Sequence, residues 1–505
     1  MRPLALAILV ATVPADAQSQ QPMSVIDWLQ DNPAESVALR PGEPPVADDA
    51  RSPEVAVRPL DAAQAAVGLV PSSVTGFPET LWRGARTETL TRLIEEAPTT
   101  GHPALQALLY SLLLTEALPA DDPARAEALL LARVDKLLEM GAIDPGQALM
   151  DQAGPLRSPA IFDRWARTAF LLGNEDQVCR MLAQARHLSP GYDLSIFCTA
   201  RAGDLSAATV QFDAAIALSL LPPEIEAPLD RFLHPELFDG AEPLPVPRNP
   251  SPLLFRIYEA VGEPLPTASL PRAFAVADLR DIAGWKAQLD AAERLARTGA
   301  LTPNTLLGLY TDRLPAASGG VWDRVAALQR FETALGTGSP DAVAKTLPAV
   351  WSQMRAVGLD VVFAELFAAD LARIALPEGP AARVARQVAL ISDDYESLAR
   401  GLTPADDTEA FWLALAAGEP SRATPPNEVS AAVAAGFAEG KDLPRGLSRD
   451  RLGEAVLRAM VLFDRGARGN LADLTDALII FRALGLEDTA RRASLQLLVR
   501  LETET

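Results

Sequence analysis

The sequence has few of the residues that usually build metal and redox centres. Its 505 residues include two cysteines and three histidines, and the histidines His102, His187 and His234 are far apart in the chain. Two of them directly precede proline, which is typical of solvated turns. Neither the cysteine spacing nor a nearby histidine completes a Cys/His ligand set. We therefore expect no metal site and no cofactor.

Motifs of several enzyme classes are also missing. The chain has no Gly-x-Ser-x-Gly, His-Glu-x-x-His, Gly-x-x-x-x-Gly-Lys or complete Gly-x-Gly-x-x-Gly. Acidic pairs, which glycoside hydrolysis requires, occur at Asp121-Asp122, Asp393-Asp394 and Asp406-Asp407. Each pair precedes a helical stretch, where carboxylates cap helix N-termini. The sequence favours a protein that is not an enzyme.

Positive charge is scarce. The chain carries 45 basic residues, of which only four are lysine, against 66 acidic residues, and its formal net charge is -21. A field of this sign repels nucleic acid and anionic membrane surfaces. We expect no nucleic-acid partner. Beyond the N-terminal segment no apolar run is long enough to span a bilayer, so we expect no integral membrane segment.

Aromatic residues are also few, at 6%, whereas alanine and leucine are abundant, and this composition favours helices over strands. A recurring pattern supports an all-α class. Glycine ends an apolar-periodic stretch, and Asp, Ser or Thr follows three residues later as an expected helix N-cap. The pattern occurs at Gly141/Asp144, Gly173/Asp176, Gly203/Ser206, Gly299/Thr302 and Gly485/Asp488.

The N-terminus has the features of a secretory signal peptide. Arg2 precedes an apolar run that ends in a small-residue cleavage site at Ala17-Gln18, so residues 1–17 are expected to be removed and the mature chain to be periplasmic. Residues 18–80 are rich in proline and alanine and are expected to form a disordered tether. Within it, a short apolar motif either docks a partner or folds back on the protein; it contains Val25, Ile26, Trp28 and Leu29.

The rest of the chain divides into five regions, consistent with two to four packed units for this length. The sequence predicts a helical-repeat region at 81–221, a proline-rich connector with one short helix at 222–275, a second helical region at 276–400, a loose helical or linker segment at 401–450, and C-terminal helices at 451–505. Apolar stripes such as Ala208, Phe212, Ala215 and Ile216 indicate the buried helix faces.

The two cysteines flank a helix-breaking turn at 188–191. Two helices joined there would bring Cys179 and Cys198 to the same height, and an oxidising compartment would allow a disulfide. The alternative is a pair of buried free thiols.

Part of the chain resembles a degenerate tetratricopeptide repeat. The residues that carry the likeness are Leu171-Leu172-Gly173-Asn174, Cys179-Arg180-Met181-Leu182-Ala183 and Leu188-Ser189-Pro190. It covers 131–223 and again 455–500, and it implies an α-solenoid of antiparallel helical hairpins. Other stretches, such as Leu81-Trp82-Arg83-Gly84, resemble exported all-helical bacterial proteins of unknown activity, a likeness that implies only fold and compartment.

One segment, 306–324, is richer in polar and aromatic side chains than a plain repeat. A glycine pair before a helix would offer backbone N–H groups to an anion, and nearby arginines and aromatics would add charge and a flat contact face. The candidate ligand or partner site consists of Tyr310, Arg313, Ser318, Gly319, Gly320, Trp322 and Arg324. The alternative is a packed loop between helices.

The function that fits these features best is a periplasmic protein–protein interaction scaffold of the cell envelope, whose partner is another envelope protein. Two alternatives use the segment at 310–324 as the site. One is an envelope enzyme such as a cell-wall hydrolase, and the other is a binding protein for a small anionic ligand.

Overall fold

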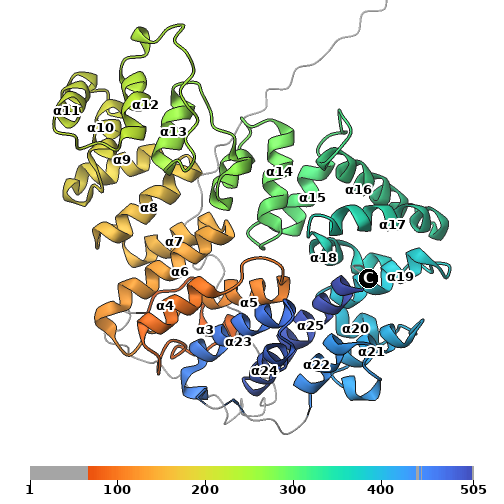
Figure 1. Ribbon diagram of the computed structural model, residues 1–505. Helices are drawn as coiled ribbons and strands as arrows, with labels where there is room; N and C mark the ends of the chain where they lie inside the picture. Colours follow the sequence, from red (N-terminus) through yellow and green to blue (C-terminus); the bar gives the residue numbers. More distant parts are fainter. Residues whose placement is uncertain (1–65, 439–442, 445, 503–505) are drawn as a thin grey trace, which may run out of the picture. The chain divides into compact units, whose positions relative to one another are not determined.

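The computed structural model describes residues 66–438, 443–444 and 446–502. Its regular structure is helical (Figure 1). Within the described ranges no β-strand forms, and the only extended pairing is two isolated bridges between residues 67–70 and 115–117. The predicted all-α class is confirmed.

Two predictions fall outside these residues. The signal peptide at 1–17 and the apolar motif of Val25, Ile26, Trp28 and Leu29 both lie in the undescribed N-terminal segment. Among the helices that the structure does describe, none is both long and apolar enough to cross a membrane.

The first described helices follow one another with short connections. Most turn an apolar stripe towards a neighbouring helix; in α6, for example, Leu130, Val134 and Leu137 are buried at the i, i+4, i+7 spacing of one helix face. The elements are α3 (Ser72–Thr75), α4 (Thr87–Glu96), α5 (Pro103–Leu114), η1 (Pro123–Arg125), α6 (Ala126–Met140), α7 (Ile143–Ala153), α8 (Pro159–Leu172), α9 (Glu175–Gln184), η2 (Arg186–Leu188), α10 (Tyr192–Arg201) and α11 (Leu205–Ala217).

The packed chain begins before the predicted boundary at 81. Phe77 is buried, and the Gly68 N–H donates a hydrogen bond to Gln152 Oε1 at 2.9 Å. Glycine is required at position 68, because a Cβ there would lie 2.2 Å from the Cα of Glu116. Residues 66–80 are therefore part of the folded body, not of a tether.

The proline-rich connector contains more helix than the single short one predicted. Proline occupies the first position of two helices there, where its missing N–H costs nothing. The second of these, α13, packs against α8 and so belongs to the main body. The elements are α12 (Pro223–Leu233), η3 (Pro235–Leu237), α13 (Pro252–Ala260), η4 (Thr267–Ser269) and η5 (Arg272–Leu279).

The second half is helical almost throughout. The segment 401–450, predicted to be loose, has well-packed helices in its described part, and Phe411 and Trp412 are buried there. The elements are α14 (Trp285–Ala296), α15 (Pro303–Thr311), α16 (Val321–Gly336), α17 (Pro340–Arg355), α18 (Asp360–Leu371), α19 (Pro380–Ile391), α20 (Tyr395–Ala399), α21 (Asp407–Ala416), η6 (Pro420–Arg422), α22 (Glu428–Gly436), η7 (Arg449–Arg451), α23 (Leu452–Ala467), α24 (Leu471–Ala483) and α25 (Glu487–Leu501).

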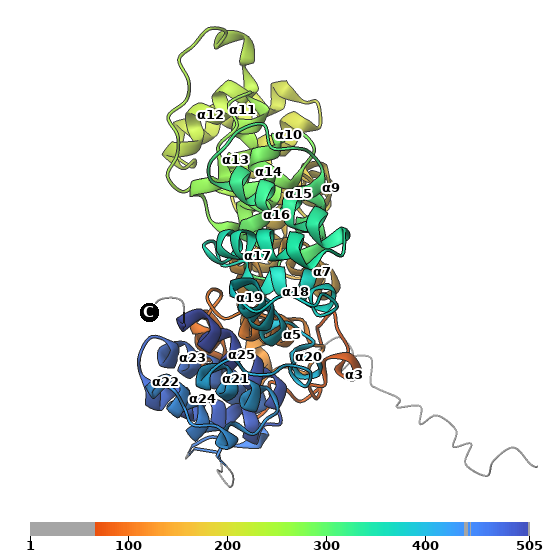
Figure 2. The same cartoon turned by 90° about the vertical axis from the view of Figure 1, so that its right-hand side faces the viewer.

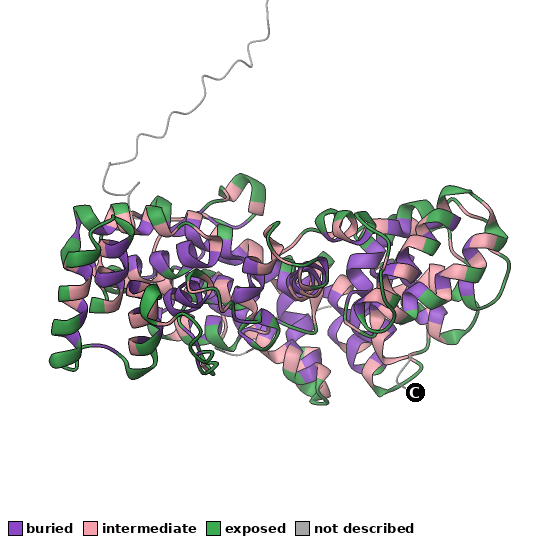
Figure 3. Cartoon of the chain, turned by 90° about the horizontal axis from the view of Figure 1, so that it is seen from above, coloured by how far each residue is buried: buried purple, intermediate pink, exposed green. Residues whose placement is uncertain are grey.

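Helices from the two ends of the described chain pack together. α25 contacts α5, and α23 contacts α4, as Figures 1 and 2 show for α5 and α25. Nearly all buried apolar side chains belong to one cluster, which runs from Phe77 to Val499. Buried residues concentrate where helices face one another (Figure 3). The described residues thus form one compact unit and not the two to four expected from length.

Candidate interaction surface

The segment 310–324 holds a buried polar network. Tyr310 is fully buried, and its hydroxyl donates to Glu293 Oε1 at 2.6 Å. Arg324 donates to both oxygens of the same carboxylate, at 2.7 and 2.6 Å. Burial, together with the charge of Glu293, raises the pKa of Tyr310 well above its usual value. Both side chains thus tie α14 to α15 and α16.

The other residues predicted for this site point elsewhere. Trp322 packs against Trp285, with ring centroids 5.1 Å apart. The Gly319 N–H, expected to be open to an anion, donates to Asp323 Oδ1 at 3.0 Å. Arg313 is exposed and pairs with its neighbour Asp312. Ser318 and Gly320 are exposed. The structure does not bring the seven predicted residues together around one cavity.

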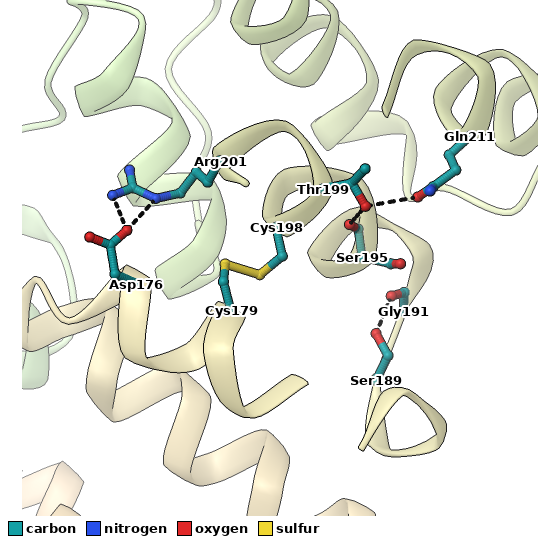
Figure 4. The surroundings of a disulfide bond; sticks show 9 residues. All are labelled: Asp176, Cys179, Ser189, Gly191, Ser195, Cys198, Thr199, Arg201 and Gln211. Atoms are coloured by element: carbon teal, nitrogen blue, oxygen red, sulfur yellow. Dashed lines mark hydrogen bonds and ion pairs between the residues drawn. A yellow bond between two sulfur atoms is a disulfide. The ribbon is translucent and has the colours of Figure 1, made fainter. Parts of the chain in front are cut away.

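The two cysteines form the predicted disulfide, which joins α9 to α10 across the turn that follows η2. Figure 4 shows its surroundings, where Thr199 of α10 donates to Gln211 of α11 at 3.4 Å. α9, α10 and α11 together enclose an open groove of about 650 Å³, and both cysteines line it. The rest of its lining combines small residues, such as Ala183, Ala202 and Ala207, with charged ones.

The groove carries available positive charge. Arg201 is paired with Asp176 at 2.5 Å, and this partnership holds the pKa of the Asp176 carboxyl below its usual value. Asp204 accepts the Ala207 N–H at the start of α11. Arg180 and Arg186 also line the groove, and no carboxylate of the described chain lies within ion-pair distance of either one.

An exposed apolar face adjoins the groove on α11. Ala207 and Gln211 line the groove, and Ala214 and Leu218 continue the same row of the helix at positions i+7 and i+11. Beside this row Val210 is 68% exposed, and Leu218 itself is 67% exposed. The large apolar side chains exposed on α10, on α11 and just after α11 are Tyr192, Leu205, Val210, Ile216, Leu218 and Leu220. Contiguous exposed apolar side chains mark surfaces that contact other molecules.

No family model, curated protein or solved structure matches the chain. The likeness to tetratricopeptide repeats therefore stays an inference from the residues quoted above.

In the described part of the chain, no group of three or more His, Cys, Asp or Glu side chains lies close enough together to hold a metal ion. His102 lies 3.3 Å from Asp464, and its pKa is lowered mainly by burial. His234 contacts Asp230 at 2.8 Å and Thr209 at 3.2 Å. Both histidines thus make contacts with side chains of the protein itself.

Sequence reasoning placed the cysteines correctly but missed the surface around them. It assigned Ile216 to the buried stripe of α11, whereas Ile216 is 37% exposed. A usable signal was present, because residues 205–220 contain a single charged side chain, Asp213. A helix with so few polar positions has more apolar surface than one buried face can use.

Proposed function

We propose that the protein is an exported periplasmic helical-repeat protein, an α-solenoid of antiparallel helical hairpins, that acts as a protein–protein interaction scaffold in the cell envelope. The observation that carries this proposal is the apolar face of α11 beside the arginine-lined groove, which we name the α11 surface. It comprises Arg180, Arg186, Val210, Ala214 and Leu218.

The chemistry of the α11 surface defines its partner. Arg180 and Arg186 lack carboxylate partners among the described residues, so an approaching acidic surface meets two available guanidinium groups. To bury the exposed side chains of Val210 and Leu218, the partner must carry apolar side chains beside those carboxylates. The partner is therefore an envelope protein segment that is both acidic and apolar. The disulfide supports the compartment, since such bonds persist in oxidising environments.

The experiment is affinity purification of the mature protein from its native envelope, with identification of the proteins that accompany it. A stoichiometric partner is expected with the wild type. Val210→Glu with Leu218→Glu should abolish its recovery, because two buried carboxylates would enter the apolar contact. Arg180→Glu with Arg186→Glu should weaken it and should remove its salt dependence.

Matched variants control for general surface effects. Ile282 and Val74 are exposed to 74% and 73%, similar to the two apolar positions, and Ile282→Glu and Val74→Glu should leave recovery unchanged. Arg330, which is exposed and without a carboxylate partner in the described chain, gives the control for charge reversal. Equal loss with control and test variants, or unchanged recovery with the test variants, would contradict the proposal.

We do not propose the hydrolase or the small-anion binder. Both require side chains of 310–324 to face a substrate, and the hydroxyl of Tyr310 and the guanidinium of Arg324 are bound to Glu293. A cell-wall fragment turned over by the purified protein would overturn this choice.

A further inference from the structure

A second surface lies in the proline-rich connector, between η3 and α13. We call residues 242–250 the strap; their sequence is Glu-Pro-Leu-Pro-Val-Pro-Arg-Asn-Pro. Figure 1 shows it as part of the long loop between α12 and α13. Helices and strands are absent from this stretch of the described chain. Four prolines in nine residues favour an extended backbone with φ near −65°.

Burial along the strap repeats every three residues. Leu244 and Pro250 are buried and Pro247 is half-buried, whereas the two residues between each of these positions are exposed. A helix has a period of 3.6 residues and a strand a period of 2, so neither produces this pattern. A polyproline II helix has three residues per turn and does. One edge of the strap therefore packs on the body, and the other two face outwards.

Three side chains of the body hold the strap by its backbone. Arg231 donates to the carbonyl of Glu242 at 2.9 Å, and Glu263 accepts the Leu244 N–H at 2.7 Å. Tyr258, which is buried, donates to the carbonyl of Pro245 at 2.6 Å. Arg231 and Glu263 also pair with each other. The extended conformation is thus fixed before any partner binds, so binding does not have to order the strap.

The two outward edges present a regular set of side chains. Pro243 and Val246 are three residues apart on one edge, and Val246 is 72% exposed. Pro245 and Arg248 lie on the other edge, and Arg248 has no carboxylate partner in the described chain. Each outward edge thus carries apolar side chains, and the cation of Arg248 follows them along the chain.

We propose that the strap is a preformed polyproline II ligand for a partner protein whose docking groove is lined by aromatic side chains and carries a carboxylate opposite Arg248. Flat aromatic rings form the shallow slots that accept proline and valine ridges of a polyproline II helix. The carboxylate sets the direction in which the strap lies, because Arg248 is near only one end. This surface uses no residue of the α11 surface and is a second, separate contact.

Site-specific crosslinking in the native envelope tests the proposal. A photo-reactive amino acid replaces Asn249, which lies on the same edge as Pro243 and Val246 and leaves both intact. One major protein adduct is expected, and mass spectrometry of the linked peptide should place tryptophan or tyrosine at the contact. Pro243→Gly with Pro245→Gly should reduce the adduct at least about tenfold, because the strap loses its preset conformation without losing Val246.

The chain provides a closely matched control. Leu237 is exposed to 72%, as Val246 is, but lies outside the strap. Val246→Glu should remove the adduct and Leu237→Glu should not, with melting temperatures equal to that of the wild type. Absence of an adduct, an adduct that survives Val246→Glu, or a linked peptide from a surface without aromatic residues would overturn the proposal.

Two further measurements identify what is recognised. A synthetic peptide of residues 241–251 should compete with the crosslink, whereas the same peptide with alanine at 243, 245 and 247 should not. Equal competition by the two peptides would show that the prolines and the conformation they favour are not recognised, which contradicts the proposal. The Val210→Glu, Leu218→Glu protein should keep the adduct at 249. That result separates failure of the strap proposal from failure of the scaffold proposal.

Discussion

The carboxyl of Glu365 on α18 has an unusually high pKa. Its pKa is raised to about 7, because its carboxylate is desolvated and Asp393 adds negative charge nearby, while Arg492 opposes the shift. A carboxyl whose pKa is higher in the folded than in the unfolded state binds its proton more tightly when folded. The free energy of unfolding contributed by Glu365 is therefore highest below pH 4.5 and falls as pH rises through 7.

Glu365→Gln should accordingly stabilise the protein at pH 8 and have no effect at pH 4.5. The gain should be about 1 kcal/mol, well below what the full shift implies, because Glu365 is desolvated only in part and the solvent that reaches its exposed surface screens the charge. Thermal or urea unfolding at the two pH values measures it. Glu332→Gln on α16, a half-buried carboxylate without a partner among the described residues, is the control. A gain that is equal at both pH values would contradict the assignment.

At the same scale, glycine positions were more predictable than caps. All five predicted glycine stops have positive φ, between 73 and 90°. Of the five predicted N-caps, only Thr302 caps its helix, by accepting the Thr305 N–H. Asp204 caps α11 in place of Ser206, and Asp144, Asp176 and Asp488 fall within the first turn. A positive φ strongly favours glycine, and Ser219 is the one other described residue that has it, whereas the cap depends on which of several polar residues meets the first turn.

At the scale of helices, arginines cap the C-terminal carbonyls of other helices. Arg256 of α13 donates to the carbonyls of Phe170 and Leu171 at the end of α8. The same contact recurs in Arg133 with α5, Arg272 with α6, Arg355 with α25, Arg449 with α24, Arg482 with α22 and Arg491 with α21. The planar guanidinium reaches several carbonyls at once and meets the negative end of the helix dipole.

These arginine contacts explain why much of the packing between distant helices could not be predicted from the sequence. The excess of arginine over lysine is visible in the sequence, but each acceptor is a backbone carbonyl of a distant helix. Carbonyls leave no residue-specific signal, so pairs such as Arg256 with Phe170 cannot be found by inspection. For the same reason the predicted connector at 222–275 gave no indication that α13 would pack on α8.

Arg133→Met tests this carbonyl contact at a buried arginine. Arg133 is 3% exposed and donates to the carbonyls of Leu113, Val67 and Thr115 at 2.8, 2.9 and 3.1 Å, and burial lowers its pKa to about 10. Methionine fills similar volume but leaves three carbonyls without this donor. We expect a loss of about 3 kcal/mol or more in the free energy of unfolding, measured by urea titration.

Two further variants isolate the cause. Arg133→Lys keeps the charge but cannot span three acceptors, so it should lose an intermediate amount. Arg330→Met, at an exposed arginine, should change little. If methionine and lysine at position 133 behave alike and both stay near the wild type, the three hydrogen bonds contribute nothing net.

At the scale of the whole molecule, α25 connects the two ends of the described chain. Its Gln496 accepts the Ala104 N–H of α5 at 2.9 Å, and its Arg500 holds Asp360 of α18 through two bonds of 2.7 Å. α25 also packs against α19, α21 and α24. Because these contacts share one buried cluster, we expect α5 to lose stability when the packing of α25 is disturbed.

Leu495→Ala should therefore weaken helices distant from it in sequence. Leu495 is fully buried in α25, and the cavity left by alanine should cost about 2–5 kcal/mol. Hydrogen exchange should increase in α5 as much as in α25, since the two open together, whereas Val210→Ala on the exposed face of α11 should leave both unchanged. If α25 exchanged faster while α5 kept its protection, the two ends of the described chain would be separate cooperative units, although their buried side chains belong to one cluster.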